Sequence, residues 1–134
     1  MNAGEGRWAP VARKDIGAAV AVLSTAGHDN RFYNITGPEL VSYREFAKLL
    51  TRETGKPAKY VALDDARYSQ WLIKNGMSDA DAQDQVNYFR EFREGMYAVK
   101  STAVRDLTGR EPQSVSQLLE ANKAVLTAAP AGLP

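Results

Sequence analysis

The stretch FYNITGPELVSYREFAKLLTRETGKPAKYVAL, residues 32–63, decides the fold. A β-type run at its start predicts a strand over 32–36, which a Gly-Pro pair ends. A Ser-x-x-Glu capping box then predicts a helix over 42–54, which a glycine ends and a proline prevents from resuming. A second strand is expected over 59–63. The stretch therefore predicts a strand, a helix and a strand, in that order.

The chain before this stretch predicts a similar unit. A short strand is expected over 7–11, where Pro10 would confine it to the edge of a sheet. An alanine-rich helix follows from Asp15 and closes at Gly27, ahead of the strand over 32–36. Because crossovers between parallel strands are right-handed, the two βαβ units predict a small three-stranded parallel sheet.

The second half of the chain is expected to be helical. Capping residues and apolar residues at helical spacing predict helices over 64–74, 78–99, 102–107 and 114–126. A glycine at position 95 is expected to weaken the second of these helices. The expected fold class is therefore α/β, in the α+β sense, with the small sheet followed by a cluster of helices.

The length of 134 residues fits one domain or part of a larger one. Residues 1–6 are small and polar and are expected to form a flexible arm. A single α/β domain is expected over 7–126. A flexible tail is expected over 127–134.

The composition excludes several classes of function. Lysines and arginines number 17 against 16 acidic residues and form no basic block, so no nucleic-acid partner is expected. The chain has no cysteine, which excludes disulfides and thiolate metal sites. The longest apolar run, residues 16–23, is too short to cross a bilayer, so no membrane partner is expected. A cytoplasmic protein without a metal site is the expectation.

Two polar positions could carry catalysis, but each has a simpler interpretation. His28 is the only histidine and stands in a polar loop, where a solvated side chain is more common than a catalytic base. Asp64 and Asp65 could form an acid–base or metal pair, yet the start of a helix explains both. No catalytic residue is therefore identified from the sequence.

A set of ordered motifs carries a family resemblance. Asp15-Ile16 opens the alanine-rich helix, and Gly27, residues 33–37, Ser42-Tyr43, Gly55-x-Pro57 and Leu107-Thr108-Gly109-Arg110 with Pro112 follow. In this order and spacing they resemble the C-terminal part of NmrA-like proteins. These are atypical short-chain dehydrogenase/reductases, and the nearest type is the NAD(P)H:quinone oxidoreductase. The resemblance covers the chain from about Gly6 to Leu126.

The resemblance implies a nucleotide domain that this chain does not contain. In that family a Rossmann domain binds NAD(P) through a glycine-rich turn between a strand and a helix. Neither that glycine pattern nor a Tyr-x-x-x-Lys pair occurs here. This chain alone is thus expected to bind no cofactor. NAD(P) is expected only where a longer chain or a partner supplies a Rossmann domain. It would be a fragment of a longer enzyme or a stand-alone protein that has lost the nucleotide half, and whether it is an enzyme stays open.

The family builds its substrate pocket from its C-terminal helices, which here are rich in aromatic residues. The resemblance therefore implies a pocket for an aromatic or quinone-like small molecule. Core packing is the other explanation for large side chains at helical spacing, and both stay open. The candidate substrate-binding residues are Tyr68, Trp71, Tyr88, Phe89, Phe92 and Met96.

Two other functions remain possible from the sequence. One is a protein-interaction or regulatory module, and the other is a cofactor-independent enzyme acting on a natural product. The helix after Asp15 is apolar on all sides, which is typical of a helix that is covered all round. A homodimer or a Rossmann-type partner domain is therefore expected in addition to a small-molecule ligand.

Overall fold

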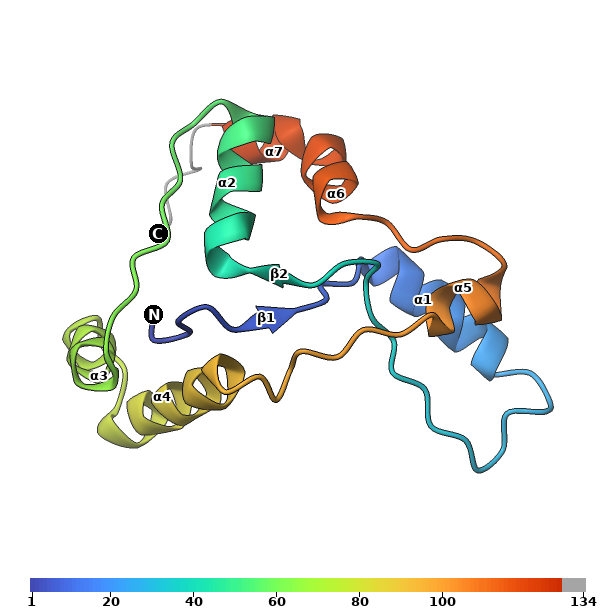
Figure 1. Ribbon diagram of the computed structural model, residues 1–134, viewed down its shortest axis with the longest axis horizontal. Helices are drawn as coiled ribbons and strands as arrows, with labels where there is room; N and C mark the ends of the chain where they lie inside the picture. Colours follow the sequence, from blue (N-terminus) through green and yellow to red (C-terminus); the bar gives the residue numbers. More distant parts are fainter. Residues whose placement is uncertain (129–134) are drawn as a thin grey trace.

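A computed structural model describes residues 1–128 of the chain. This part is rich in helices and has one small sheet (Figure 1). Its elements are β1 (Arg7–Trp8), α1 (Arg13–Leu23), β2 (Val41–Ser42), α2 (Tyr43–Thr54), α3 (Asp65–Lys74), α4 (Asp79–Arg93), α5 (Ala103–Thr108), α6 (Val115–Ala121) and α7 (Lys123–Thr127).

The helices gather in three lobes around the β1–β2 pair (Figure 1). In the aromatic lobe α3 packs on α4, next to the N-terminal residues 1–8. In the small-residue lobe α1 packs on α5. In the third lobe α2 packs on α6 and α7. The connections between lobes are long and extended, so the molecule has an open outline.

The sheet differs from the sequence-based expectation. Its two strands run antiparallel, with Arg7 opposite Ser42 and Trp8 opposite Val41. The predicted three-stranded parallel sheet is not found within residues 1–128. The prediction of an α/β chain with a small sheet and many helices is confirmed. The predicted number of strands and their parallel direction are wrong.

The two other predicted strands are extended segments without a ladder partner. Residues 32–36 lie next to Ser101, whose N–H donates to the Thr36 hydroxyl at 2.9 Å. Residues 59–63 meet Met1, whose carbonyl accepts from the Leu63 N–H at 3.1 Å. A strand requires a row of backbone partners, and neither segment has one among the described residues. The strands predicted over 32–36 and 59–63 are therefore wrong, because strand pairing depends on distant parts of the chain that local sequence does not encode.

Helix starts and stops follow the local signals. Ser42 makes both bonds of its capping box with Glu45, and Ser114 makes the same pair with Gln117. Gly55 ends α2 in the left-handed region, with φ of 71°, as a glycine C-cap requires. The helix expected over 78–99 stops earlier, at Arg93. There the chain turns through a Gly95 with positive φ.

The N-terminal residues lie inside the aromatic lobe rather than projecting from it. Asn2 and Ala3 have no exposed surface. Gly6 lies so close to α4 that an added Cβ would stand 2.3 Å from the Phe92 carbonyl oxygen. At the other end of the chain α7 continues through Thr127, and residues 129–134 of the predicted tail lie outside the described part.

A buried carboxylate fixes the small-residue lobe. Asp15, in the first turn of α1, is fully buried. The Arg110 guanidinium donates to it at 2.8 Å and the Gln113 N–H at 2.7 Å. These bonds tie α1 to the loop that follows α5. The opposite side of α1 stays open, since the side chain of Val20 is 53% exposed and that of Ile16 is 38% exposed.

Candidate ligand-binding cleft

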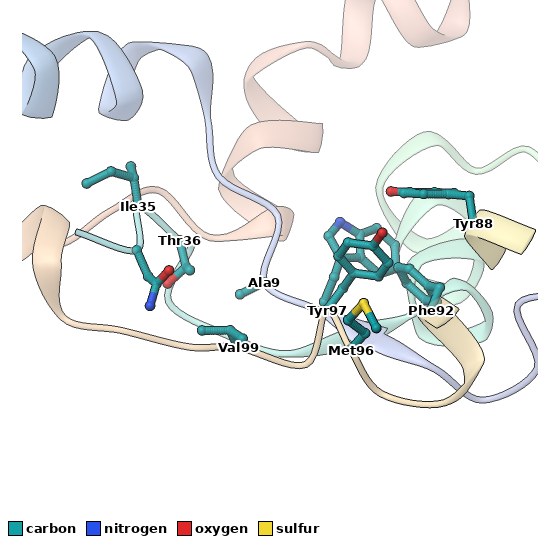
Figure 2. A pocket seen from close by; sticks show the side chains of 10 residues that line it. Ala9, Ile35, Thr36, Tyr88, Phe92, Met96, Tyr97 and Val99 are labelled. Atoms are coloured by element: carbon teal, nitrogen blue, oxygen red, sulfur yellow. The ribbon is translucent and has the colours of Figure 1, made fainter. Parts of the chain in front are cut away.

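A cleft of about 330 Å³ opens between α4, β1 and the extended segment 34–36 (Figure 2). We call it the aromatic cleft. Its larger lining side chains are Trp8, Tyr88, Phe92, Met96, Tyr97 and Val99. Ala9 and residues 34–36 complete the wall.

Helical spacing and one turn explain how α4 supplies most of this wall. Tyr88 and Phe92 are four residues apart and therefore share a face of the helix. The turn at Gly95 then brings Met96 and Tyr97 back over the same face. In Figure 2 the side chains of Met96, Tyr97 and Phe92 crowd together, and Tyr88 stands at the outer end.

Aromatic rings line the cleft in tilted and edge-on pairs. The Trp8 and Phe92 ring centroids are 5.4 Å apart at 60°, and the Tyr88 and Tyr97 centroids are 5.1 Å apart at 45°. Such pairs add about 0.5–1.5 kcal/mol beyond their burial, which stabilises this arrangement of rings. A largely apolar wall of aromatic side chains suits a flat aromatic molecule.

One phenol at the cleft has a defined hydrogen bond. The Tyr97 hydroxyl donates to Glu91 Oε2 at 3.2 Å. Desolvation and this carboxylate raise the pKa of Tyr97 above its ordinary value. The Tyr97 phenol therefore keeps its proton at neutral pH.

The structure divides the six predicted site residues among three places. Tyr88, Phe92 and Met96 line the aromatic cleft. Tyr68 and Trp71 line a second cleft of about 490 Å³ with Met1, residues 59–61 and Leu63. Phe89 lies in the core between the two, where its ring meets those of Tyr68 and Tyr88 at 5.7 and 5.1 Å. The single face proposed from the sequence is therefore two clefts separated by core.

Phe92 belongs to the core and to the cleft at once. Only 2% of its side chain is exposed, and it packs with Tyr68, Val86 and Phe89. Tyr88 and Met96 are exposed at 44% and 63%, so they are free to contact a ligand. Core packing therefore explains Phe92, while the exposed positions of Tyr88 and Met96 leave their ligand-binding role a prediction.

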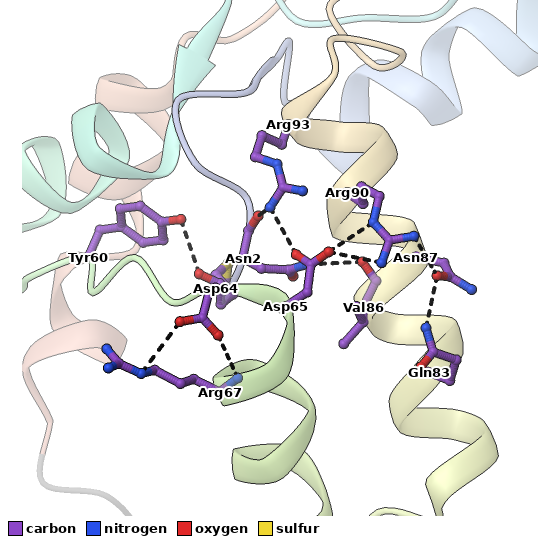
Figure 3. A network of polar contacts seen from close by, with 11 residues as sticks. Asn2, Tyr60, Asp64, Asp65, Arg67, Gln83, Val86, Asn87, Arg90 and Arg93 are labelled. Carbon is purple, nitrogen blue, oxygen red and sulfur yellow. Dashed lines mark hydrogen bonds and ion pairs between the residues drawn. The ribbon is translucent and has the colours of Figure 1, made fainter.

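A polar network joins α4 to α3 (Figure 3). The Asp65 carboxylate accepts hydrogen bonds from Arg90 and Arg93, each at 2.9 Å, and from the Asn2 amide at 2.7 Å. The bond from Arg93 is the main cause that lowers the pKa of Asp65 well below its usual range. Asp64 caps α3 by accepting from the Arg67 N–H at 2.8 Å, as the sequence predicts for one of the two aspartates.

A third, polar cavity of about 510 Å³ contains the only histidine. Its polar lining groups include His28, Arg31, Asn34, Thr102 and Asp106, and we call it the polar cavity. His28 Nδ1 lies 3.0 Å from the Tyr33 hydroxyl, within hydrogen-bond distance. His28 therefore lies partly exposed at the wall of a solvent-open cavity, in a loop as expected from the sequence.

The described residues do not fit a dinucleotide phosphate group. Such a group needs glycines at the turn from a strand into a helix. The β1–α1 connection runs through Ala9, Pro10, Val11 and Ala12, and β2 leads directly into α2. Within residues 1–128 no group of three or more potential ligand side chains could hold a metal ion. No helix of this part is long and apolar enough to cross a membrane.

Two aromatic cleft residues, Trp8 and Tyr97, are not among the candidates predicted from the sequence. Trp8 comes from the N-terminal strand, and nothing in its local sequence connects it with α4. Tyr97 lies just beyond Gly95, and recognising that glycine as a helix end would have placed Tyr97 on a returning turn. That left-handed glycine was the available signal.

Comparison with known proteins identifies the family. No family model matches the chain. The NAD(P)H azoreductase of Xenophilus azovorans is 33% identical over 132 residues, which are 96% of this chain and 46% of the relative. Quinone oxidoreductase 2 of Escherichia coli is 35% identical over 78 residues, 58% of this chain and 27% of the relative. The chain belongs to the NmrA-like family.

Solved structures of NmrA-like proteins share the fold. The E. coli quinone oxidoreductase QOR2 complexed with NADPH has a TM-score of 0.79 and 26% identity, over 90% of this chain and 43% of that one. The Citrobacter triphenylmethane reductase complexed with NADP(H) has a TM-score of 0.76 at 22% identity, which supports the fold alone. The chain corresponds to the C-terminal part of NmrA-like proteins. It spans about half the length of the curated relatives it matches.

Proposed function

We propose that this chain is the substrate-binding part of an NmrA-like oxidoreductase acting on aromatic or quinone-like compounds. The aromatic cleft holds the ring of the substrate. NAD(P)H is bound by a Rossmann-type domain outside residues 1–134, because the described residues lack a phosphate-binding turn. The chain's own part is to bind and orient the ring.

The aromatic cleft is the observation that carries this proposal. It is lined by four aromatic side chains and a methionine, and three of its residues were candidates from the sequence. Methionine and aromatic side chains adapt to flat ligands through dispersion and sulfur–ring contacts. The name of one relative points the same way, since a quinone is a conjugated ring compound.

Calorimetric titration of the chain with 1,4-naphthoquinone tests the proposal. Met96→Ala removes an exposed cleft side chain at little cost to stability, and a loss of about fivefold in affinity is expected from the lost contact area. Trp71→Ala removes a larger side chain from the second cleft and is the matched control, with affinity unchanged. Equal effects of the two substitutions, or no binding at all, would reject the assignment.

A partner domain or second copy is the other function that an observation favours. The chain exposes 8909 Å², whereas a compact monomer of this mass exposes roughly 6,900 Å². The excess of about 2,000 Å² is more than one partner contributes to an interface of standard size. Exposed apolar side chains stand on α1 and on the extended segments, at Ile16, Val20, Phe32 and Val61. These exposed side chains favour an interface in which a Rossmann-type domain or a second copy of the chain covers them.

The third possibility, a cofactor-independent enzyme, stays a hypothesis. The His28–Tyr33 pair has the geometry of a proton-transfer pair, but no third group within the described residues orients the imidazole. It therefore does not form a complete catalytic arrangement.

A further inference from the structure

The polar cavity adjoins the aromatic cleft. Asn34 lines both, so the extended segment around it forms a shared wall. Figure 2 shows Ile35 and Thr36 at the end of the aromatic cleft that lies away from Tyr88. The polar cavity therefore begins where the aromatic cleft ends.

Hydrogen bonds hold the shared wall in place. The Ser101 N–H donates to the Thr36 hydroxyl at 2.9 Å, and the Ser101 hydroxyl donates to the Asn34 carbonyl. From this junction the chain reaches the aromatic cleft at Val99 and the polar cavity at Thr102. The two cavities thus keep a fixed position relative to each other.

Arg31 supplies the available charge of the polar cavity. No ion pair or hydrogen bond of its guanidinium is found among residues 1–128. Asp106, the carboxylate of the same cavity, accepts from the Thr102 hydroxyl and pairs with Arg105 at 3.3 Å. Arg105 therefore offsets part of the Asp106 charge, whereas Arg31 has no such partner among these residues.

We propose that the two cavities hold one ligand, with its aromatic ring in the aromatic cleft and an anionic substituent beside Arg31. The proposal rests on the proposed function, because it takes the aromatic cleft as the place of the ring. Its ligand class is a conjugated ring compound bearing a carboxylate or sulfonate group. A charge-assisted bond from a guanidinium to such a group is stronger than a neutral hydrogen bond. The carboxylate of Asp106 repels the anion and therefore limits the gain in binding affinity.

Two matched ring compounds test this assignment on the intact chain. Anthraquinone-2-sulfonate carries the anion, and 2-(hydroxymethyl)anthraquinone carries a neutral group at the same position. We expect the sulfonate to bind about tenfold more tightly at low salt, and the preference to shrink as ionic strength rises. Arg31→Gln should abolish the preference, because it lowers the affinity for the sulfonate much more than that for the neutral compound.

A second variant gives an effect of opposite sign. Asp106→Asn removes the opposing charge, so it should strengthen binding of the sulfonate about threefold and leave the neutral compound unaffected. Circular dichroism checks that both variants keep the helical content. Equal affinities for the two compounds, unchanged by Arg31→Gln, would overturn the proposal while the aromatic cleft stands. Failure of both compounds to bind would overturn the proposed function as well.

Discussion

The aromatic lobe packs large rings around α3 and α4, whereas the small-residue lobe packs alanines and valines around one buried carboxylate. In the first, Phe92 and its neighbours fill the core, and Asp65 links two helices and the N-terminal residues. In the second, α1 is covered by α5 on one side and open on the other. The aromatic lobe thus has a continuous core of large side chains, whereas one side of α1 in the small-residue lobe is exposed.

Removing an aromatic ring from the core should have the largest effect on stability, and it tests how far the aromatic lobe depends on its own core. Phe92→Ala empties a site that is almost fully buried, so we expect a loss of about 3–5 kcal/mol in the free energy of unfolding. Urea denaturation measures it. Met96→Ala, at an exposed position nearby, is the control and should change stability by less than about 0.5 kcal/mol. A loss confined to ligand binding would show that Phe92 is a pocket residue rather than core.

The buried carboxylate of the small-residue lobe provides the next effect. Arg110→Met leaves Asp15 buried with the Gln113 N–H as its remaining partner. Because one bond survives and Arg110 is half-exposed, the expected loss is about 1–3 kcal/mol in unfolding free energy. Arg105→Met, which removes only surface ion pairs, is the matched control and should cost less than about 0.5 kcal/mol. Equal stabilities of the two variants would contradict the role given to Asp15.

Acid should weaken the link between α3 and α4. The pKa of Asp65 is lowered in the folded state, so ionised Asp65 stabilises the fold above its unfolded pKa of about 3.9. That stability is lost as the pH falls below about 4 towards the folded pKa. Asp65→Asn should therefore cost about 1 kcal/mol at pH 7, after solvent screening, and less as the pH falls below 4.

Asp64→Asn is the control for this measurement. Asparagine caps a helix as well as aspartate does, so the variant should keep both its stability and its acid profile. If it lost as much as Asp65→Asn, the cap of α3 would be responsible and not the arginine network.

The open face of α1 predicts a change in association with little change in stability. Val20→Glu places a charge on an exposed position, where substitutions change unfolding free energy by less than about 0.5 kcal/mol. If α1 pairs with a second copy, light scattering should show a dimer for the unmodified chain and a monomer for the variant. Gln70→Glu, on the exposed side of α3, adds the same charge and should leave the mass unchanged. If the chain is a monomer both with and without the substitution, a Rossmann-type domain is favoured as the partner that covers α1.

Sequence predicted the parts of this structure that depend on near neighbours. The caps at Ser42 and Ser114 and the stops at Gly55 and Gly109 lie within a few residues of the bonds they make. The family was also recognisable, because its motifs are local and ordered.

The parts that depend on distant residues were not predictable. Trp8 reaches the aromatic cleft only because Gly6 lets the chain approach Phe92, and no pattern in either segment indicates the other. The split of the candidate residues between two clefts depends on which face of α4 meets α3. The burial of Asn2 depends on Asp65 and Val86 in the same way.

The two tryptophans allow the central claim, that the aromatic cleft holds the ligand ring, to be tested directly. Trp8 lines the aromatic cleft, and Trp71 lines the second cleft. Tryptophan fluorescence is followed during titration with 1,4-naphthoquinone in Trp71→Phe, which reports Trp8, and in Trp8→Phe, which reports Trp71. The account predicts saturable quenching when Trp8 is the reporter and only weak, collisional quenching when Trp71 is. Saturable quenching of Trp71 alone would contradict it and would place the ring in the second cleft.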